Sequence, residues 1–142
     1  MKDEDWTLGL LLEIVRQTAQ ALLVQRGALE PYGVKLIGEE ARPLTFFPAD
    51  SRPGAEQAEL LKAILEDLRA PSAEPLHGVA LVLAVDTEAG QHLFAAQIES
   101  ASFRVLALFR YWRAPDGTFV IGEPELKNEL MVAEGLDWPR SG

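Results

Sequence analysis

The chain contains no cysteine among its 142 residues, which excludes disulfides and thiolate chemistry. No apolar run approaches the roughly 18 residues that a membrane span needs, so no membrane partner is expected. Lysine and arginine are scarce, 13 against 22 aspartates and glutamates, and the formal net charge is −9. Nucleic acids require a clustered basic surface, and this charge balance therefore argues against a nucleic-acid partner.

The usual signatures of catalytic and cofactor sites are also missing. The sequence has no Gly-x-Ser-x-Gly elbow, no phosphate-binding loop, no dinucleotide-binding glycine pattern and no calcium loop. Its two histidines, His77 and His92, fall at opposite ends of a predicted hairpin, on the order of 25 Å apart. They cannot share a metal within one subunit, and the sequence predicts no cofactor and no metal.

The composition is that of a soluble globular protein, with 48% apolar and 25% charged residues. A chain of this length is ordinary for one domain, so residues 1–142 are expected to form a single domain with disordered tails at 1–5 and 140–142. The acidic start, Met1 to Asp5, does not resemble a secretory signal. A cytoplasmic location is the default expectation.

The longest organised stretch runs from His77 to Arg113 and reads as three apolar strands separated by two turn signals. Placing the second turn at Ser100 and Ala101 sets Ile98 opposite Phe103, and the first turn sets Asp86 opposite Gln91. Side chains alternate between the two faces of a strand. This register predicts a uniformly apolar core face, made of Val79, Leu81, Leu83, Val85, Phe94 and Ile98.

The opposite face of this meander is unusual, because an apolar centre occupies positions that a solvated face would fill with polar residues. Another part of the chain, a second subunit or a partner is expected to cover it. A mildly apolar solvent face built largely of alanine is the alternative. The candidate interface residues are Val82, Ala84, Leu93, Ala95, Leu106 and Leu108.

The remaining segments predict two long helices, three more strands and one short helix. Residues 6–26 follow the 3.6-residue helical period between a cap at Asp5 and Gly27, and a second helix runs from Pro53 to Ala70. Val34–Ile37 and Leu44–Phe47 form a hairpin, whose second strand is expected at a sheet edge because prolines bracket it. Thr118 to Ile121 returns as a strand, and Glu123 to Ala133 predicts a short helix.

Together these segments predict a two-layer α+β domain in the order α-β-β-α-β-β-β-β. An antiparallel sheet of about six strands carries both long helices on one face. The apolar surface of the first helix is wider than one sheet contact requires, which again indicates a second contact surface.

Three polar residues of the meander form a candidate polar site: His92, Arg104 and Arg110. Arginines among aromatic residues can bind anions or stack on bases. The favoured interpretation is structural, with Arg104 beside Gln97, Arg110 beside Gln91 and charges that protect a sheet rim.

A short motif, Leu22-Leu23-x-x-x-Gly27-x-Leu29-x-Pro31-Tyr32-Gly33, resembles a group of small uncharacterised bacterial proteins. In that group a helix ends in Gly-x-Phe/Leu-x-Pro-aromatic-Gly and is followed by a hairpin, a helix and a meander. The element order also resembles roadblock or profilin-like domains, which commonly act as dimeric interaction modules. The resemblance implies no catalytic residues.

Three functions are therefore open. The favoured hypothesis is a non-enzymatic interaction or assembly module that forms a homodimer through the sheet face or the first helix. An acidic inhibitor, such as an immunity protein that binds a basic partner, is the second. The third is a small enzyme using His92 with a nearby carboxylate, which would require a concave pocket around that histidine.

Overall fold

In the computed structural model, the residues described are 3–51, 54–70, 73–86, 92–100 and 103–127. Their helices and strands, in chain order, are α1 (Asp3–Arg26), β1 (Tyr32–Ile37), β2 (Arg42–Phe46), α2 (Pro48–Ser51), α3 (Gln57–Arg69), β3 (Leu76–Asp86), β4 (His92–Glu99), β5 (Arg104–Arg113), β6 (Phe119–Ile121) and β7 (Glu125–Lys127).

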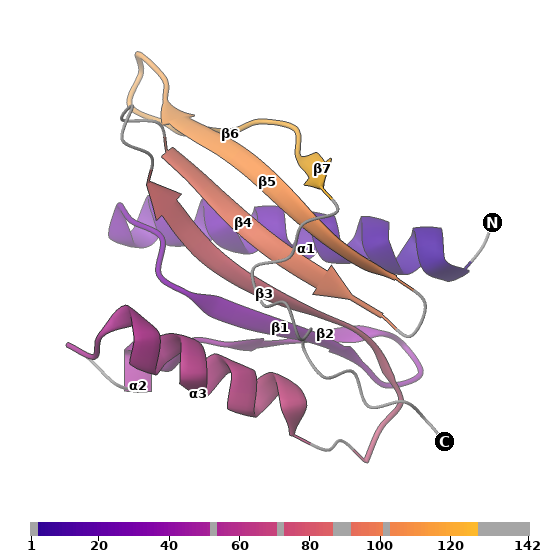
Figure 1. The fold of residues 1–142 in the computed structure, drawn as a ribbon. Helices are drawn as coiled ribbons and strands as arrows, with labels where there is room; N and C mark the ends of the chain where they lie inside the picture. The colour runs from indigo at the N-terminus through magenta and orange to yellow at the C-terminus, as the bar shows by residue number, and fades with distance from the viewer. Residues whose placement is uncertain (1–2, 52–53, 71–72, 87–91, 101–102, 128–142) are drawn as a thin grey trace.

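The strands form one antiparallel sheet in the order β2-β1-β3-β4-β5-β6, with the short β7 also paired to β5 (Figure 1). The predicted α+β class, the antiparallel sheet and the helix order are confirmed. The proline-flanked strand β2 lies at an edge of the sheet as predicted, because proline cannot donate a ladder hydrogen bond.

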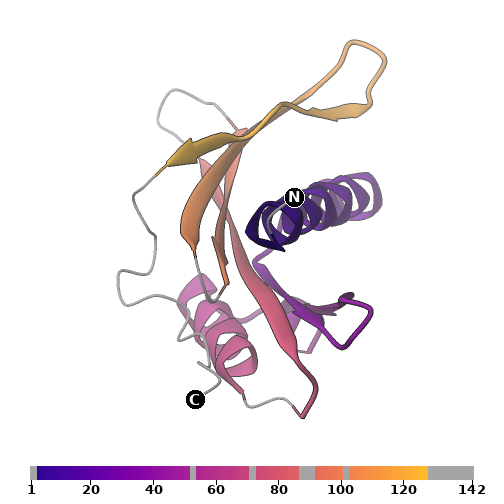
Figure 2. The same cartoon turned by 90° about the vertical axis from the view of Figure 1, so that its right-hand side faces the viewer.

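The two long helices lie on opposite faces of the sheet (Figure 2), which differs from the predicted placement on one face. Helix α1 packs into the larger core cluster, where Leu11 and Val15 accompany Phe94 and other sheet residues. Helix α3 packs into a smaller cluster with Val79 and Leu81, through Ile64 and Leu68.

The pairing of β3 with β4 explains the difference. Asp86 lies opposite His92, where the sequence interpretation had Gln91. A slip of one residue exchanges the faces of a strand. Val79 and Leu81 therefore face α3, while Val82 faces α1 with Phe94. Strand β3 carries apolar residues on both faces because it lies between the two helices.

The pairing of β4 with β5 is shifted by two residues from the prediction. Ile98 lies opposite Val105, where Phe103 was expected, and Glu99 lies opposite Arg104. A shift of two keeps each side chain on its face. Phe94 and Phe109, which consequently pair, stack with ring centroids 4.6 Å apart beneath α1.

Three residues of the motif between Leu22 and Gly33 have clear structural roles. Gly27 ends the helix with a positive φ of 71°, a conformation that glycine adopts without strain. The Tyr32 hydroxyl donates to the Val15 carbonyl oxygen at 2.8 Å inside the core. A Cβ on Gly33 would lie 2.7 Å from Ile64 Cγ2, so the close approach of α3 requires glycine.

Several boundaries differ from the sequence interpretation. Asp3–Asp5 belong to α1, so Asp5 is not its cap, and α3 begins at Gln57 after the separate short helix α2. Asp50 lies within α2 and forms an ion pair with Arg26. Glu125–Lys127 form β7, where a helix was expected. The rest of that predicted helix, 128–133, and the predicted tail 140–142 lie outside the described residues.

Helix α1 also protects the short strand β6. Arg16 Nη2 donates to the Ile121 carbonyl at 3.2 Å, and Gln20 Nε2 donates to the Phe119 carbonyl at 3.1 Å. These bonds occupy backbone oxygens at a sheet edge, which would otherwise be open to another strand.

By length and composition α1 is apolar enough to cross a membrane between Trp6 and Arg26, the one such helix in the described part of the chain. One side of it packs against the sheet through Leu11, Val15 and Ala19, all fully buried. The predicted cytoplasmic location stays a prediction.

Candidate functional site

The α3-side face of the sheet is incompletely covered at the ends of β3, β4 and β5. Val85 lies opposite Leu93, and Leu83 lies opposite Ala95, whose other neighbour is Leu108. Val85 on β3 is 39% exposed. Trp112, on the same face of the sheet near the end of β5, is 48% exposed. We call this surface the β3–β5 patch, made of Leu83, Val85, Leu93, Leu108 and Trp112.

Charged residues of both signs border the β3–β5 patch. A small cavity of about 160 Å³ lies between the leucines of the patch and these charged residues, which we call the rim. It is lined by Leu93, Leu108, Arg110, Glu123, Glu125 and Lys127. Within the rim, Lys127 Nζ lies 3.2 Å from Glu125 Oε1. An apolar centre with a charged rim is the usual arrangement of a protein interface.

The six predicted interface residues do not stay together. Leu93 and Leu108 belong to the β3–β5 patch, and Ala95 and Leu106 share its face but are buried. The other two, Val82 and Ala84, lie on the α1 face because of the one-residue difference in the β3–β4 pairing. Sequence reasoning missed Leu83 and Val85 for the same reason.

The exposed indole of Trp112 was not among the predicted interface residues. It lies over Gly122, where an added Cβ would come within 3.3 Å of the ring. The absence of a side chain at Gly122 allows the indole to approach the backbone this closely.

Arg104 does not pair with Gln97 as predicted. Its Nε lies 3.2 Å from Oε1 of Glu99, which is fully buried. Gln97 donates from Nε2 to Glu99 Oε2 at 2.7 Å. The arginine therefore neutralises a buried carboxylate, and this supports a structural role for Arg104.

His92 lines a cavity of about 440 Å³ on the α1 side, which we call the α1-end pocket. Its other described lining residues are Gly27, Ala28, Leu29, Ala84, Tyr111, Trp112, Arg113 and Phe119. None of these is aspartate or glutamate, so the described lining supplies no carboxylate partner for a catalytic histidine. The turn between β3 and β4 offers two further carboxylates: Asp86, which lies opposite His92 in the strand pairing, and Glu88, which lies outside the described residues.

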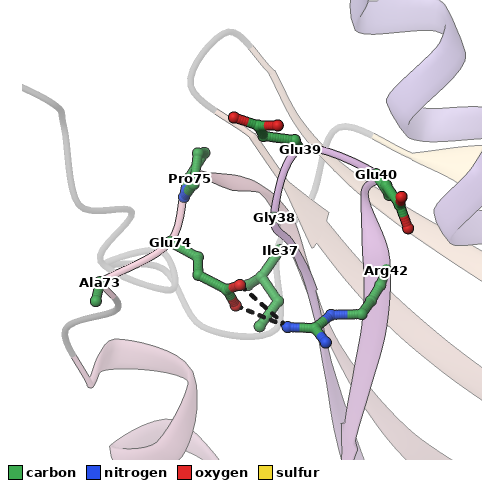
Figure 3. Close-up of a pocket in the computed structure, with 8 residues that line it drawn as sticks. All are labelled: Ile37, Gly38, Glu39, Glu40, Arg42, Ala73, Glu74 and Pro75. Carbon is green, nitrogen blue, oxygen red and sulfur yellow. Dashed lines mark hydrogen bonds and ion pairs between the residues drawn. The ribbon is translucent and has the colours of Figure 1, made fainter.

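A third cavity, also about 440 Å³, lies beside the β1–β2 hairpin (Figure 3). Three of the residues lining it are acidic: Glu39, Glu40 and Glu74. Arg42 Nη2 contacts both carboxylate oxygens of Glu74, at 3.1 and 2.9 Å. Part of the acidic charge is thus neutralised, and the pocket alone does not identify a basic partner.

The second histidine, His77, lies near the hairpin pocket. Its Nε2 lies 2.6 Å from the Gly38 carbonyl oxygen, and its ring meets Trp6 edge-on at 6.4 Å. Among the described residues, no three histidine, aspartate or glutamate side chains gather closely enough to hold a metal ion.

Two buried titratable groups stabilise the two helices. Burial raises the pKa of the Tyr32 phenol well above its ordinary value of 10.0. Under α3, Lys35 Nζ donates to the Ala70 carbonyl at 3.0 Å, and burial lowers the pKa of that amine. These groups occupy structural positions at the helix contacts, away from the three cavities.

Comparisons with family models, curated proteins and solved structures find no match for this chain. The resemblance to small bacterial proteins therefore stays a prediction, as does the division of the chain into one domain.

Proposed function

We propose that the protein is a non-enzymatic interaction module that forms a homodimer through the β3–β5 patch. The exposed apolar character of this patch carries the proposal. Val85 and Trp112 are more than one-third exposed on a face where Ala95 and Leu106 are buried. Burial of such a surface against a second protein removes apolar area from water and favours association.

The composition of the patch also fits a protein interface. Tryptophan and arginine carry a large share of the binding energy in known interfaces, and Trp112 and Arg110 are neighbours on the same face of β5. Leu93 and Leu108 are half-buried and form the apolar centre of the patch, between β3 and the Arg110–Trp112 pair.

The charges of the rim favour a second copy of the chain as partner. A two-fold interface brings the same surface of both subunits together and therefore needs self-complementary charge. Arg110 and Lys127 lie near Glu123 and Glu125 around one cavity, so each subunit can offer both signs to the other. Such pairing offsets part of the repulsion between two chains that each carry a net charge of −9.

Sedimentation of the wild-type protein over a range of concentrations tests the proposal. We expect a monomer–dimer equilibrium that approaches twice the chain mass of 15.6 kDa. Val85→Glu places an unpaired charge in the interface, and we expect it to weaken dimerisation at least tenfold. Val24→Glu is the matched control, because Val24 is 69% exposed on α1.

A wild-type protein that stays monomeric at all concentrations would contradict the proposal. So would a dimer that Val85→Glu and Val24→Glu weaken equally, because the contact would then lie elsewhere. Circular dichroism of both variants separates a lost interface from a lost fold.

A further inference from the structure

The α1-end pocket has the size and lining of a small-molecule site. Its volume of about 440 Å³ falls within the roughly 300–1,000 Å³ that such sites usually occupy. Its lining residues come from the segment just after α1, the start of β4, the end of β5 and the start of β6. These elements are labelled in Figure 1. Val85 and the leucines of the β3–β5 patch lie on the other face of the sheet, and Trp112 at the end of that patch borders both surfaces.

A continuous series of aromatic rings leads from the core to this pocket. Phe109 stacks on Phe94, whose ring lies 6.1 Å from that of Tyr111. Tyr111 in turn stacks on His92, with centroids 5.3 Å apart and an interplanar angle of 28°. The buried phenylalanines anchor this series, so the tyrosine and histidine offer a positioned surface to a flat ring.

Arg113 supplies the cationic group of the pocket. Its guanidinium lies 4.5 Å from the centroid of the Phe119 ring, which also lines the cavity. Arg113 and Tyr111 share a face of β5 two residues apart, about 7 Å along the strand. A planar guanidinium is suited to binding a carboxylate through two parallel hydrogen bonds.

The charge around the pocket favours a monoanion. Among the described lining residues Arg113 is charged, and no acidic side chain accompanies it. The cavity also borders the C-terminal end of α1, which carries a partial negative charge. One arginine beside that helix end can neutralise a carboxylate but is a weak site for a dianionic phosphate.

We propose that the α1-end pocket binds a flat aromatic carboxylate, with its ring against the His92–Tyr111 pair and its carboxylate on Arg113. An aromatic acid satisfies the stacking surface and the cation together. A neutral aromatic compound leaves Arg113 without an anion, and an aliphatic acid cannot stack.

Titration of the full chain with naphthoate, followed by backbone-amide NMR, tests this site. We expect saturable shifts centred on His92, Tyr111 and Arg113, with a submillimolar Kd. Naphthamide, which is neutral, and cyclohexanecarboxylate, which is not aromatic, should each bind at least tenfold more weakly. Inorganic phosphate should produce no saturable shift at these residues.

Two variants make the assignment specific. Arg113→Gln is expected to weaken naphthoate binding about tenfold and to leave naphthamide binding unchanged, since the amide does not need the cation. Arg42→Gln is the control, because Arg42 lies on β2 at the opposite edge of the sheet, and this variant should bind naphthoate as the wild type does.

Three results would each overturn the proposal. These are the absence of saturable naphthoate binding in the millimolar range, equal binding of naphthoate and naphthamide, and naphthoate affinity that Arg113→Gln leaves unchanged. Tighter binding of phosphate than of naphthoate would show that the pocket recognises a different anion.

Discussion

The two faces of the sheet are covered to different extents. Helix α1, with 24 residues, lies across the sheet and seals a core that includes Phe94, Phe109 and Ala107. Helix α3, with 13 residues, contacts mainly β1 and β3 and forms a cluster with Val79 and Leu81. Beyond α3, the same face ends in the half-exposed β3–β5 patch. One face thus supplies most of the stability, and the other retains surface for a partner.

Truncation of neighbouring residues on β4 should reveal this difference most strongly. Phe94 is fully buried under α1, and Phe94→Ala is expected to lower the free energy of unfolding by about 3–5 kcal/mol. Leu93 points to the other face and is half-buried, so Leu93→Ala should cost less than half as much. Urea denaturation measures both values, and equal losses would contradict the difference between the faces.

Glycines at the closest helix contacts offer a second comparison. A Cβ on Gly78 would lie 2.6 Å from Leu11 Cδ1 of α1, and one on Gly33 would lie 2.7 Å from Ile64 Cγ2 of α3. Both Gly78→Ala and Gly33→Ala are expected to destabilise the protein by about 1–3 kcal/mol, because Leu11 or Ile64 must move from its packed position.

Gly9→Ala is the control for these two substitutions. No atom lies within 4 Å of a Cβ added at Gly9, which is exposed on α1. Alanine at this position should raise the free energy of unfolding by up to about 1 kcal/mol, through its greater helix propensity. A neutral effect of Gly33→Ala would indicate that α3 packs less closely on the sheet than α1 does.

Alkaline pH should act on the two faces in opposite directions. Burial raises the pKa of Tyr32, so above about pH 10 the unfolded chain loses a proton that the folded chain keeps. The free energy of unfolding should then fall by about 1.4 kcal/mol per pH unit from this group. Tyr32→Phe is expected to remove that part of the decline in urea denaturation between about pH 9 and 11.

Lys35, on the α3 face, has a pKa lowered by burial. The unfolded chain therefore binds more protons than the folded chain as the pH approaches 10.5, and this group makes stability rise with pH in that range. A wild-type decline that persists unchanged in Tyr32→Phe would contradict the assignment to the phenol.

Much of the architecture could be predicted from the sequence because its patterns are local. The helical period of α1 and the prolines around β2 each determine a nearby structure. In the turn between β5 and β6, Asp116 Oδ1 accepts bonds from the Thr118 amide and hydroxyl, at 3.0 and 2.7 Å. The faces of β4 and β5 were also correct, since polar and apolar residues alternate there.

The register of β3 could not be predicted in the same way. Leu81 and Val82 are both apolar and both buried, because a helix covers each face. A strand with two apolar faces has no alternation of polar and apolar residues, so its sequence does not show which side chains face α1 and which face α3. The length of the loop before β4 sets this register. The misplacement of α3 and of two candidate interface residues follows from this one uncertainty.

The α1-end pocket was out of reach for a related reason. Its residues come from the end of α1 and from four strands, and their approach depends on the β3–β4 and β4–β5 registers together. The sequence drew attention to His92 and to the arginines of β5. It contained no local signal that Arg113 and Phe119 would meet beside that histidine.

The exposure of Val85 as a function of protein concentration tests the central claim most directly. The chain has no cysteine, so V85C carries a single thiol whose rate of chemical labelling reports its access to solvent. We expect rapid labelling in dilute protein and progressively slower labelling as the concentration rises, while V24C on α1 labels at one constant rate. Slow labelling of V85C at every concentration would show that the chain itself covers this face. A constant rapid rate would show that no second copy binds there.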